Sequence, residues 1–220
     1  MKIDHNAFAL FKRIFGKYYS MKYPFFASFI ILIIVIRHAI RRNRNLDDSS
    51  RAAFWEKERL ANETRKKPLD DLIYIKPDTT YFPMDVMPES EEIRDCKRII
   101  EELKNEKIVN LTGITNTDLK LRYGVANLPL LTSYDDRFTL LVQTYEKWAD
   151  ILWENGYIAE AVPILEEQVR IRADVSSVYK RLAAYYKENS APEKIEHLKE
   201  VAGTLNETSR AVILKALEEI

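Results

Sequence analysis

Few side chains in this sequence are of the types that most often catalyse reactions or bind metals. Of the three histidines, His5 and His38 lie on either side of an apolar stretch, and His197 alone lies in the remainder of the chain. Zinc sites and serine–histidine–aspartate triads need several such groups close together, which this distribution does not supply. The single cysteine, Cys96, lies on the apolar face of an expected helix, with no histidine nearby to activate it. We therefore expect Cys96 to be a buried apolar residue and not a nucleophile.

Two pairs of neighbouring aspartates can in principle serve acid–base or metal chemistry. They are Asp70 with Asp71 and Asp135 with Asp136, and the second pair falls in the first turn of an expected helix, where the helix dipole already explains it. Neither G-x-G-x-x-G nor G-x-x-x-x-G-K-[ST], the glycine-rich patterns that bind nucleotide phosphates, occurs in the sequence. These observations predict a protein that is not an enzyme and that uses no metal or other cofactor.

The overall composition predicts an all-α protein without a nucleic-acid partner. Lysine plus arginine and aspartate plus glutamate both number 34, so the chain has no net charge to attract a phosphate backbone. Five glycines among 220 residues, with 46% hydrophobic and 31% charged residues, are typical of long helices and not of sandwiches or barrels with many tight turns.

The apolar run YPFFASFIILIIVI, residues 23–36, is the strongest candidate for contact with a lipid bilayer. As a helix it reaches about two-thirds of a hydrocarbon core of ~30 Å, and extension back to Tyr18 gives the required length at the cost of one lysine near the end. Tyrosines precede the run and arginines follow it, as at a membrane interface. We therefore expect residues 18–40 to form a single transmembrane helix. A buried core helix and a signal-peptide segment are the alternatives.

The flanks of this expected membrane helix give a weak indication of its orientation. Five basic residues lie on each side, but those after the apolar run are more densely clustered, which favours a cytoplasmic C-terminal domain. Residues 1–17 are basic and carry aromatic side chains at helical spacing. This segment is expected to form either an interfacial amphipathic helix or a disordered basic tail.

Residues 41–88 are expected to form a juxtamembrane linker. Within it, residues 43–50 are polar, and Ser50 can cap a charged helix over residues 51–65 that ends before Pro68. The following residues 69–88 contain prolines and a short alternating run, which predict extended chain laid over the next domain.

Residues 89–220 are expected to form a helical domain. Ser90 and the glutamates after it predict the start of an amphipathic helix over residues 91–107. A short helix capped by Thr117 and ended by Gly124 should follow, and Pro129 is expected to keep the next residues extended. Because the passage 108–131 is rich in apolar residues, it must pack either on its own domain or on a partner.

The region after residue 131 contains an internal repeat. Ser133 is expected to cap a helix over residues 134–154, and Asn155–Gly156 forms the turn to a second helix over residues 158–171. Thirty-four residues on, Tyr145, Trp148, Ala149 and Leu152 are echoed by Tyr179, Leu182, Ala183 and Tyr186. On these residues the chain resembles a tetratricopeptide repeat (TPR) protein, with repeats over about 134–171 and 175–204 and a capping helix over 206–220. Pro163 and Ser190 depart from the family pattern, and Pro163 predicts a local kink.

The resemblance implies an all-α, solenoid-like domain that holds a protein or peptide partner in the concave groove formed by the first helix of each pair. By repeat phase, the groove residues would be Gln143, Glu146, Asp150, Trp153, Ser177, Lys180 and Lys187. The acidic residues among them contradict the carboxylate clamp of TPR adaptors for chaperone tails, so a mixed-charge partner and an exposed tryptophan anchor are expected instead. The passage 108–131 also looks like one found in uncharacterised small membrane-anchored bacterial proteins that end in such repeats.

Two functions from different classes follow from this sequence. The first is a membrane-anchored, non-catalytic scaffold or adaptor that binds proteins in its groove. The alternative is an accessory structural subunit of a membrane complex, whose contacts come from the membrane helix and the 108–131 passage while the groove stays empty.

Overall fold

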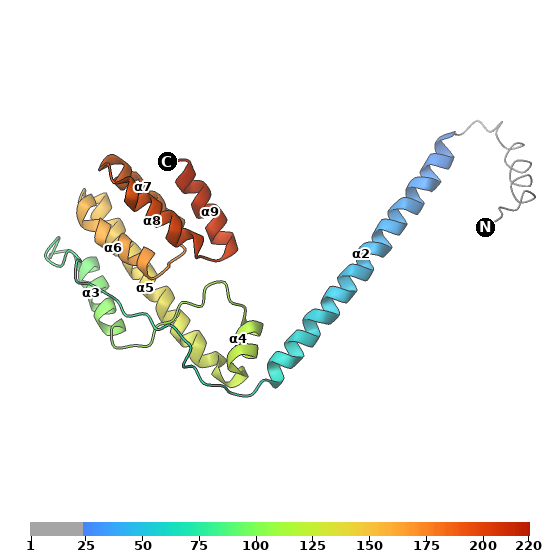
Figure 1. Cartoon of the computed structure of the whole chain (residues 1–220), viewed down its shortest axis with the longest axis horizontal. Coiled ribbons are helices and arrows are strands. Elements are labelled where there is room, and N and C mark those ends of the chain that lie inside the picture. The colour runs from blue at the N-terminus through green and yellow to red at the C-terminus, as the bar shows by residue number, and fades with distance from the viewer. Residues whose placement is uncertain (1–23) are drawn as a thin grey trace, which may run out of the picture. The chain divides into compact units, whose positions relative to one another are not determined.

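The computed structural model describes residues 24–220, and their regular secondary structure is helical, which confirms the all-α prediction. The expected basic segment 1–17 and residues 18–23 of the expected membrane helix lie outside this range. The chain divides into two compact units, residues 1–58 and 59–220. The helices are α2 (Pro24–Glu63), α3 (Glu91–Leu103), α4 (Asn116–Tyr123), the short η1 (Val125–Asn127), α5 (Leu128–Glu154), α6 (Ile158–Arg170), α7 (Ser176–Glu188), α8 (Pro192–Gly203) and α9 (Glu207–Glu218) (Figure 1).

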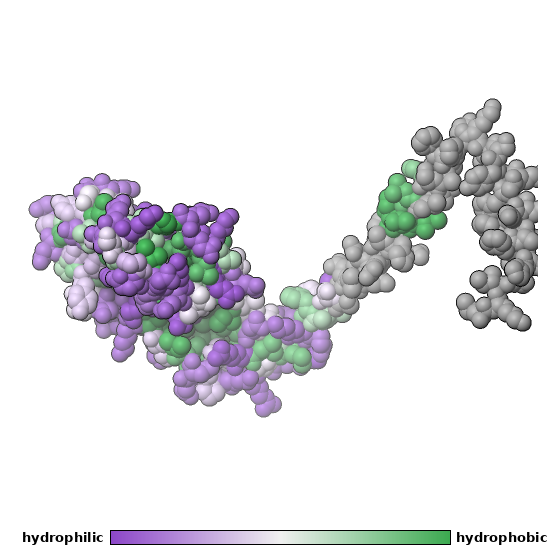
Figure 2. All heavy atoms as spheres, turned by 45° about the horizontal axis from the view of Figure 1, so that its top comes forward, coloured by the Kyte–Doolittle hydropathy of each residue, from purple (hydrophilic) through white to green (hydrophobic). Residues whose placement is uncertain are grey.

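Helix α2 is a single helix of 40 residues, which corrects the expected division at Ser50. The residues 43–50 contain neither proline nor glycine, and asparagine, aspartate and serine in a helix cost less than ending one helix and nucleating another. The helix stops at Glu63, five residues before Pro68. Its side chains Phe29 and Leu32 to Ile36 are exposed and form the green band on α2 in Figure 2.

In residues 24–220, no helix combines the length and the apolar character that a membrane crossing requires.

Residues 64–90, here called the strap, connect α2 to α3 without forming a helix; they include the expected extended segment 69–88 and contain several turns. Ile75 donates its backbone N–H to the carbonyl oxygen of Ile108 at 2.9 Å, the one β-bridge in residues 24–220. Phe82 is buried, and its ring centre lies 5.3 Å from that of Tyr145 and 5.5 Å from that of Trp148. The strap is therefore part of the hydrophobic core.

Helix α3 begins as expected, with the Ser90 hydroxyl accepting the backbone N–H of Ile93 at 3.3 Å. The apolar face buries four side chains, which are Ile93, Cys96, Ile100 and Leu103. The helix ends at Leu103 and not at the expected residue 107, because the chain must leave the helix before Ile108 can pair with the strap. This face packs on α5, so α3 belongs to the same hydrophobic core as the later helices.

The passage 108–131 packs on its own domain. Five of its apolar side chains are buried in a second hydrophobic cluster with Tyr134, and they are Val109, Leu111, Leu119, Tyr123 and Leu131. Thr115, and not Thr117, caps α4 by accepting the N–H of Asp118 at 3.2 Å. Gly124 ends α4 as expected; a β-carbon there would lie 2.1 Å from the carbonyl oxygen of Arg65, so only glycine fits against the strap.

Helix α5 starts earlier than the sequence predicted. Pro129 lies in its first turn, where a backbone N–H has no acceptor within the helix. Proline lacks this N–H and therefore loses no hydrogen bond there, so Pro129 starts a helix and does not keep the chain extended. Ser133 is therefore inside the helix, and its hydroxyl donates to the carbonyl oxygen of Leu130 at 2.8 Å instead of capping. Asp135 is likewise beyond the first turn and accepts the N–H of Leu111 at 3.0 Å.

Helices α5 to α9 pack in chain order, each on the next, as Figure 1 shows for the yellow to red part of the chain. The hairpin α5–α6 begins at Leu128, before the expected residue 134, whereas α7–α8 lies within the expected 175–204; α9 packs on α7 and α8 at the end. The eight side chains that define the 34-residue echo are all buried. Helix α6 continues through Pro163 as one unbroken helix.

Three successive helices end in the same way. Gly156, Arg172 and Ser190 follow α5, α6 and α7 with positive φ angles of 83°, 57° and 55°. At each end, the backbone N–H of the following residue donates to a carbonyl oxygen in the last turn of the helix. These hydrogen bonds join Tyr157 to Leu152, Ala173 to Gln168 and Ala191 to Tyr186, all at 2.9 Å. Two of the three positions therefore hold a left-handed conformation without the glycine that favours it.

Candidate partner-binding groove

Three of the residues expected from the repeat phase lie together on α5. Gln143, Glu146 and Asp150 are spaced by three and four residues, so they share one helix face, and they line a groove of about 410 Å³. The other lining residues are Glu92 from α3 and Lys147, Ile151 and Glu154 from α5. We call this the α5 groove.

Helix α7 forms contacts with the acidic face of α5. The hydroxyl of Ser177 donates to Oε1 of Glu146 at 3.3 Å, so these two expected residues do meet. The guanidinium of Arg181 forms an ion pair with Asp150 and lies 5.5 Å from the ring centre of Trp153. Arg181 was not predicted. Asp150 and Arg181 are 31 residues apart, which is close to the 34-residue period. This separation is the one feature of the sequence that could have suggested their pairing.

The remaining expected groove residues do not line the α5 groove. Trp153 is only half-buried; its ring packs against the core and is covered by Arg181, which corrects the expectation of an exposed anchor. Lys180 is exposed on α7. Lys187 donates to the carbonyl oxygen of Ile220, so it ties the end of the chain to α7.

The α5 groove is predominantly acidic. Four carboxylates line it, those of Glu92, Glu146, Asp150 and Glu154, against the single ammonium group of Lys147. Lys147 lies 4.0 Å from Glu92, and both side chains are more than half exposed, so this pair is screened by water. The surplus negative charge suits a positively charged segment of a partner.

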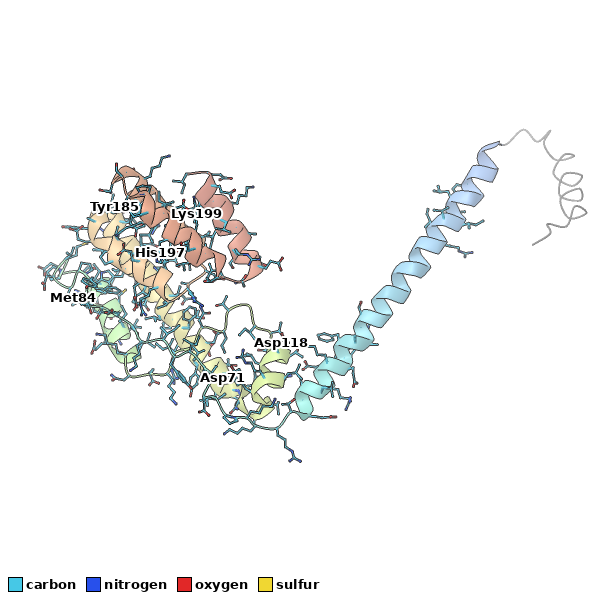
Figure 3. All side chains as sticks on the ribbon, in the orientation of Figure 1. Asp71, Met84, Asp118, Tyr185, His197 and Lys199 are labelled. Carbon is cyan, nitrogen blue, oxygen red and sulfur yellow. The ribbon has the colours of Figure 1, made fainter. Side chains whose placement is uncertain are left out.

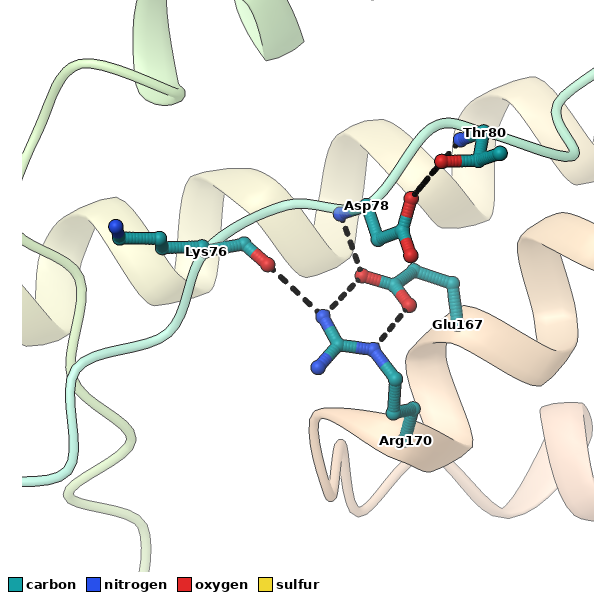
Figure 4. A network of polar contacts seen from close by, with 5 residues as sticks. All are labelled: Lys76, Asp78, Thr80, Glu167 and Arg170. Carbon is teal, nitrogen blue, oxygen red and sulfur yellow. Dashed lines mark hydrogen bonds and ion pairs between the residues drawn. The ribbon is translucent and has the colours of Figure 1, made fainter.

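A second polar cluster holds the strap to α6 (Figure 4). The carboxylate of Glu167, only 6% exposed, accepts two hydrogen bonds from Arg170, at 2.5 and 2.7 Å, and the N–H of Asp78 at 3.0 Å. Arg170 also donates to the carbonyl oxygen of Lys76 at 2.9 Å. These residues are up to 94 residues apart, and the sequence carries no local pattern that would have paired them.

Burial favours the neutral forms of the lone cysteine and of one buried tyrosine. Cys96 is buried, and burial raises the pKa of its thiol. Burial likewise raises the pKa of Tyr179 to about 12. His197 is exposed on α8, 3.7 Å from the carboxylate of Glu200 (Figure 3). Within the described part of the chain, no three histidine, cysteine, aspartate or glutamate side chains gather where they could hold a metal.

Comparisons with protein-family models, curated proteins and solved structures found no match to this chain. The TPR resemblance therefore stays a prediction that rests on the residues of the 34-residue echo.

Proposed function

We propose that this protein is a non-catalytic scaffold that binds a protein partner in the α5 groove and is tethered to a membrane near its N-terminus. The observation that carries the binding role is the α5 groove itself. Gln143, Glu146 and Asp150 converge there, and α7 reinforces the same face through Ser177 and Arg181.

The charges of the groove define the expected partner. The α5 side presents carboxylates, while Lys180 on α7 is exposed and positive. A partner segment with basic residues toward α5 and an acidic residue toward α7 would match both helices. Such complementarity favours fast association and selects against wrongly charged partners.

The membrane tether is supported by the exposed apolar side chains of α2. Phe29 and Leu32 to Ile36 are exposed on α2. A contiguous exposed apolar surface of this kind is typical of contact with lipid or with another protein. Basic residues flank it in the sequence on both sides. Our proposal keeps residues 18–40 as the tether and the helical domain in the cytoplasm.

The groove is tested with Gln143→Lys and Glu154→Lys combined in the full-length chain. Both side chains are exposed and take no part in the contacts between α5 and α7, so the fold should be retained. The charge change should weaken capture of a native partner at least about tenfold, measured by quantitative mass spectrometry of co-purified proteins.

The matched control is Glu193→Lys on α8, which makes a similar charge change away from the groove. It should leave the co-purified set unchanged. If the groove variant and the control retain the same proteins, the scaffold proposal is wrong. Loss of those proteins only when residues 18–40 are replaced would favour the accessory-subunit alternative.

A further inference from the structure

A second cavity of about 670 Å³ lies where the strap meets the turns between the helices. It is lined by residues from five segments, 71–76, 109–114, 122–123, 170–174 and 204–206. We call it the turn cavity. Its volume falls in the range of about 300–1,000 Å³ that is usual for ligand pockets. It shares no lining residue with the α5 groove, so an argument from it does not depend on the function proposed above.

The walls of the turn cavity are held in place by side-chain hydrogen bonds. Asn110 donates to the carbonyl oxygen of Arg172 at 3.0 Å and accepts the N–H of Thr112 at 3.0 Å. On the opposite turn, Asp174 accepts from Asn206 at 3.2 Å and from the hydroxyl of Ser209 at 2.7 Å. Five segments that are distant in the sequence are therefore fixed around one space before any ligand binds, which lowers the entropic cost of binding.

The carboxylates that line the turn cavity are already satisfied from within the protein. Asp174 has the two donors named above. Asp71 accepts from Arg122 at 2.9 Å and from the hydroxyl of Tyr123 at 3.3 Å; it lies beside α4 in Figure 3. Although burial opposes the shift, the bonds from Arg122 keep the pKa of Asp71 below its ordinary value. Arg122 neutralises the charge of Asp71, whereas the donors to Asp174 are neutral and its negative charge stays at the cavity.

Two basic side chains at the same cavity lack partners within the described part of the protein. In residues 24–220, no hydrogen bond or ion pair engages the side chain of Arg172 or of Lys76, although both line the cavity. Lys107 lies nearby, with its ammonium group 5.3 Å over the ring of Tyr74, a further lining residue. Two cations, Arg172 and Lys76, therefore stand against one carboxylate without a cationic partner, Asp174, and the cavity keeps a positive surplus.

Arg172 also occupies a costly backbone conformation. Its φ of 57° is the left-handed conformation that glycine adopts at the equivalent turn, Gly156. A side chain in this conformation is strained, because its β-carbon lies close to the following carbonyl oxygen. Non-glycine residues in such conformations cluster at functional sites, where the side chain gives a benefit that glycine cannot.

Apolar side chains flank these cations. Ile73 is 80% exposed, and Tyr74 and Ile114 are each 39% exposed. A small inorganic anion would neutralise Arg172 but would leave these side chains in water. A peptide with acidic residues and a neighbouring apolar side chain would satisfy both features, since it would also bury apolar surface. We propose that the turn cavity binds an acidic, extended peptide segment through Arg172 and Lys76, with an apolar side chain against Ile73 and Ile114.

The test is fluorescence anisotropy with the full-length chain in a non-ionic detergent and a labelled glutamate-rich peptide that contains one leucine. We expect saturable binding by the unchanged chain and at least about tenfold weaker binding by Arg172→Gly and by Lys76→Glu. Lys215→Glu, which removes an exposed cation of α9 outside this cavity, is the matched control and should bind as the unchanged chain does.

Arg172→Gly separates a binding role from a structural one. Because glycine relieves the left-handed conformation, this variant should melt roughly 2–4 °C higher while it binds the peptide more weakly. Equal binding by Arg172→Gly and the unchanged chain would overturn the proposal, as would equal binding of a peptide with glutamine in place of glutamate. Binding that millimolar inorganic phosphate abolishes, and that Ile73→Ser leaves unchanged, would assign the cavity to a small anion instead.

Discussion

In the hairpins α5–α6 and α7–α8, backbone hydrogen bonds join residues a few positions apart, whereas the strap is held by partners far along the chain. Asp78 contacts Glu167 across 89 residues, and Phe82 packs on Tyr145 and Trp148. One substitution removes only a small share of the hydrogen bonds that stabilise a helix. The strap has few contacts with the rest of the domain, so one substitution removes a large share of them. We therefore expect single substitutions to affect the strap more than the hairpin turns.

Phe82→Ala should have the largest effect. It removes a buried ring from the core between the strap and α5, and a buried phenylalanine truncated in this way typically costs about 3–5 kcal/mol. Unfolding by urea measures the loss, and limited proteolysis should show new cleavage in residues 64–90. Tyr81→Ala is the matched control, because Tyr81 is 81% exposed and its loss should change stability by about 0.5 kcal/mol or less. Equal stability of the two variants would show that the strap does not hold the core together.

Glu167→Ala should have the second-largest effect. It leaves the N–H of Asp78 without its acceptor and frees Arg170, at a cost of about 2 kcal/mol in the free energy of unfolding. Hydrogen exchange should become faster in the strap before it does so in α5 or α6. Glu167→Gln keeps one acceptor oxygen and should lose less. If both variants exchange like the unchanged chain, the cluster in Figure 4 does not pin the strap.

Two substitutions in the hairpin turns should change the free energy of unfolding in opposite directions. Gly156→Ala places a side chain at φ 83°, where nothing lies within 4 Å of the added β-carbon, so only backbone strain of roughly 1 kcal/mol opposes it. Ser190→Gly relieves the same strain at the equivalent turn and should stabilise the chain by up to about 1 kcal/mol. Thermal unfolding measures both. Shifts of the same sign would mean that the two turns are not equivalent.

The smallest effect concerns pH and the strap turn at Asp78. The carboxylate of Asp78 accepts the N–H of Thr80 at 3.0 Å and its hydroxyl at 2.6 Å, and these bonds lower the pKa of Asp78. A lowered pKa in the folded state contributes stability above the ordinary value near 3.8, and this contribution is lost as the pH falls through the folded pKa. At pH values below ~4, the hydrogen-exchange protection of the strap should therefore decrease slightly. Thr80→Ala should reduce this pH dependence, and an unchanged dependence would contradict the assignment to Asp78.

Several elements could be predicted because their signals are local. Ser90 capped α3, Gly124 ended α4, and the apolar stripe through Cys96 was buried, since each depends on neighbours within about one helical turn. The errors have local reasons too. By the pattern of the sequence Pro129 predicts extended chain, but a proline in the first turn starts a helix. Polar residues 43–50 were interpreted as a linker, although no residue there excludes a helix.

The candidate sites divide in the same way. Helical periodicity alone placed Gln143, Glu146 and Asp150 on one face, because residues three and four apart share a face in any helix. Arg181 on Asp150 and the covered ring of Trp153 depend on how α7 packs on α5, which no local pattern states.

The sequence by itself determined the helical class, the 34-residue echo and the buried side chains that define it, because hydrophobic periodicity is a property of neighbouring residues. Only the tertiary structure decided where the strap runs, that Glu167 and Arg170 hold it, and that five segments enclose the turn cavity. Those features join residues tens of positions apart. Their pairing follows from the packing of whole helices and not from the spacing of residues along the chain.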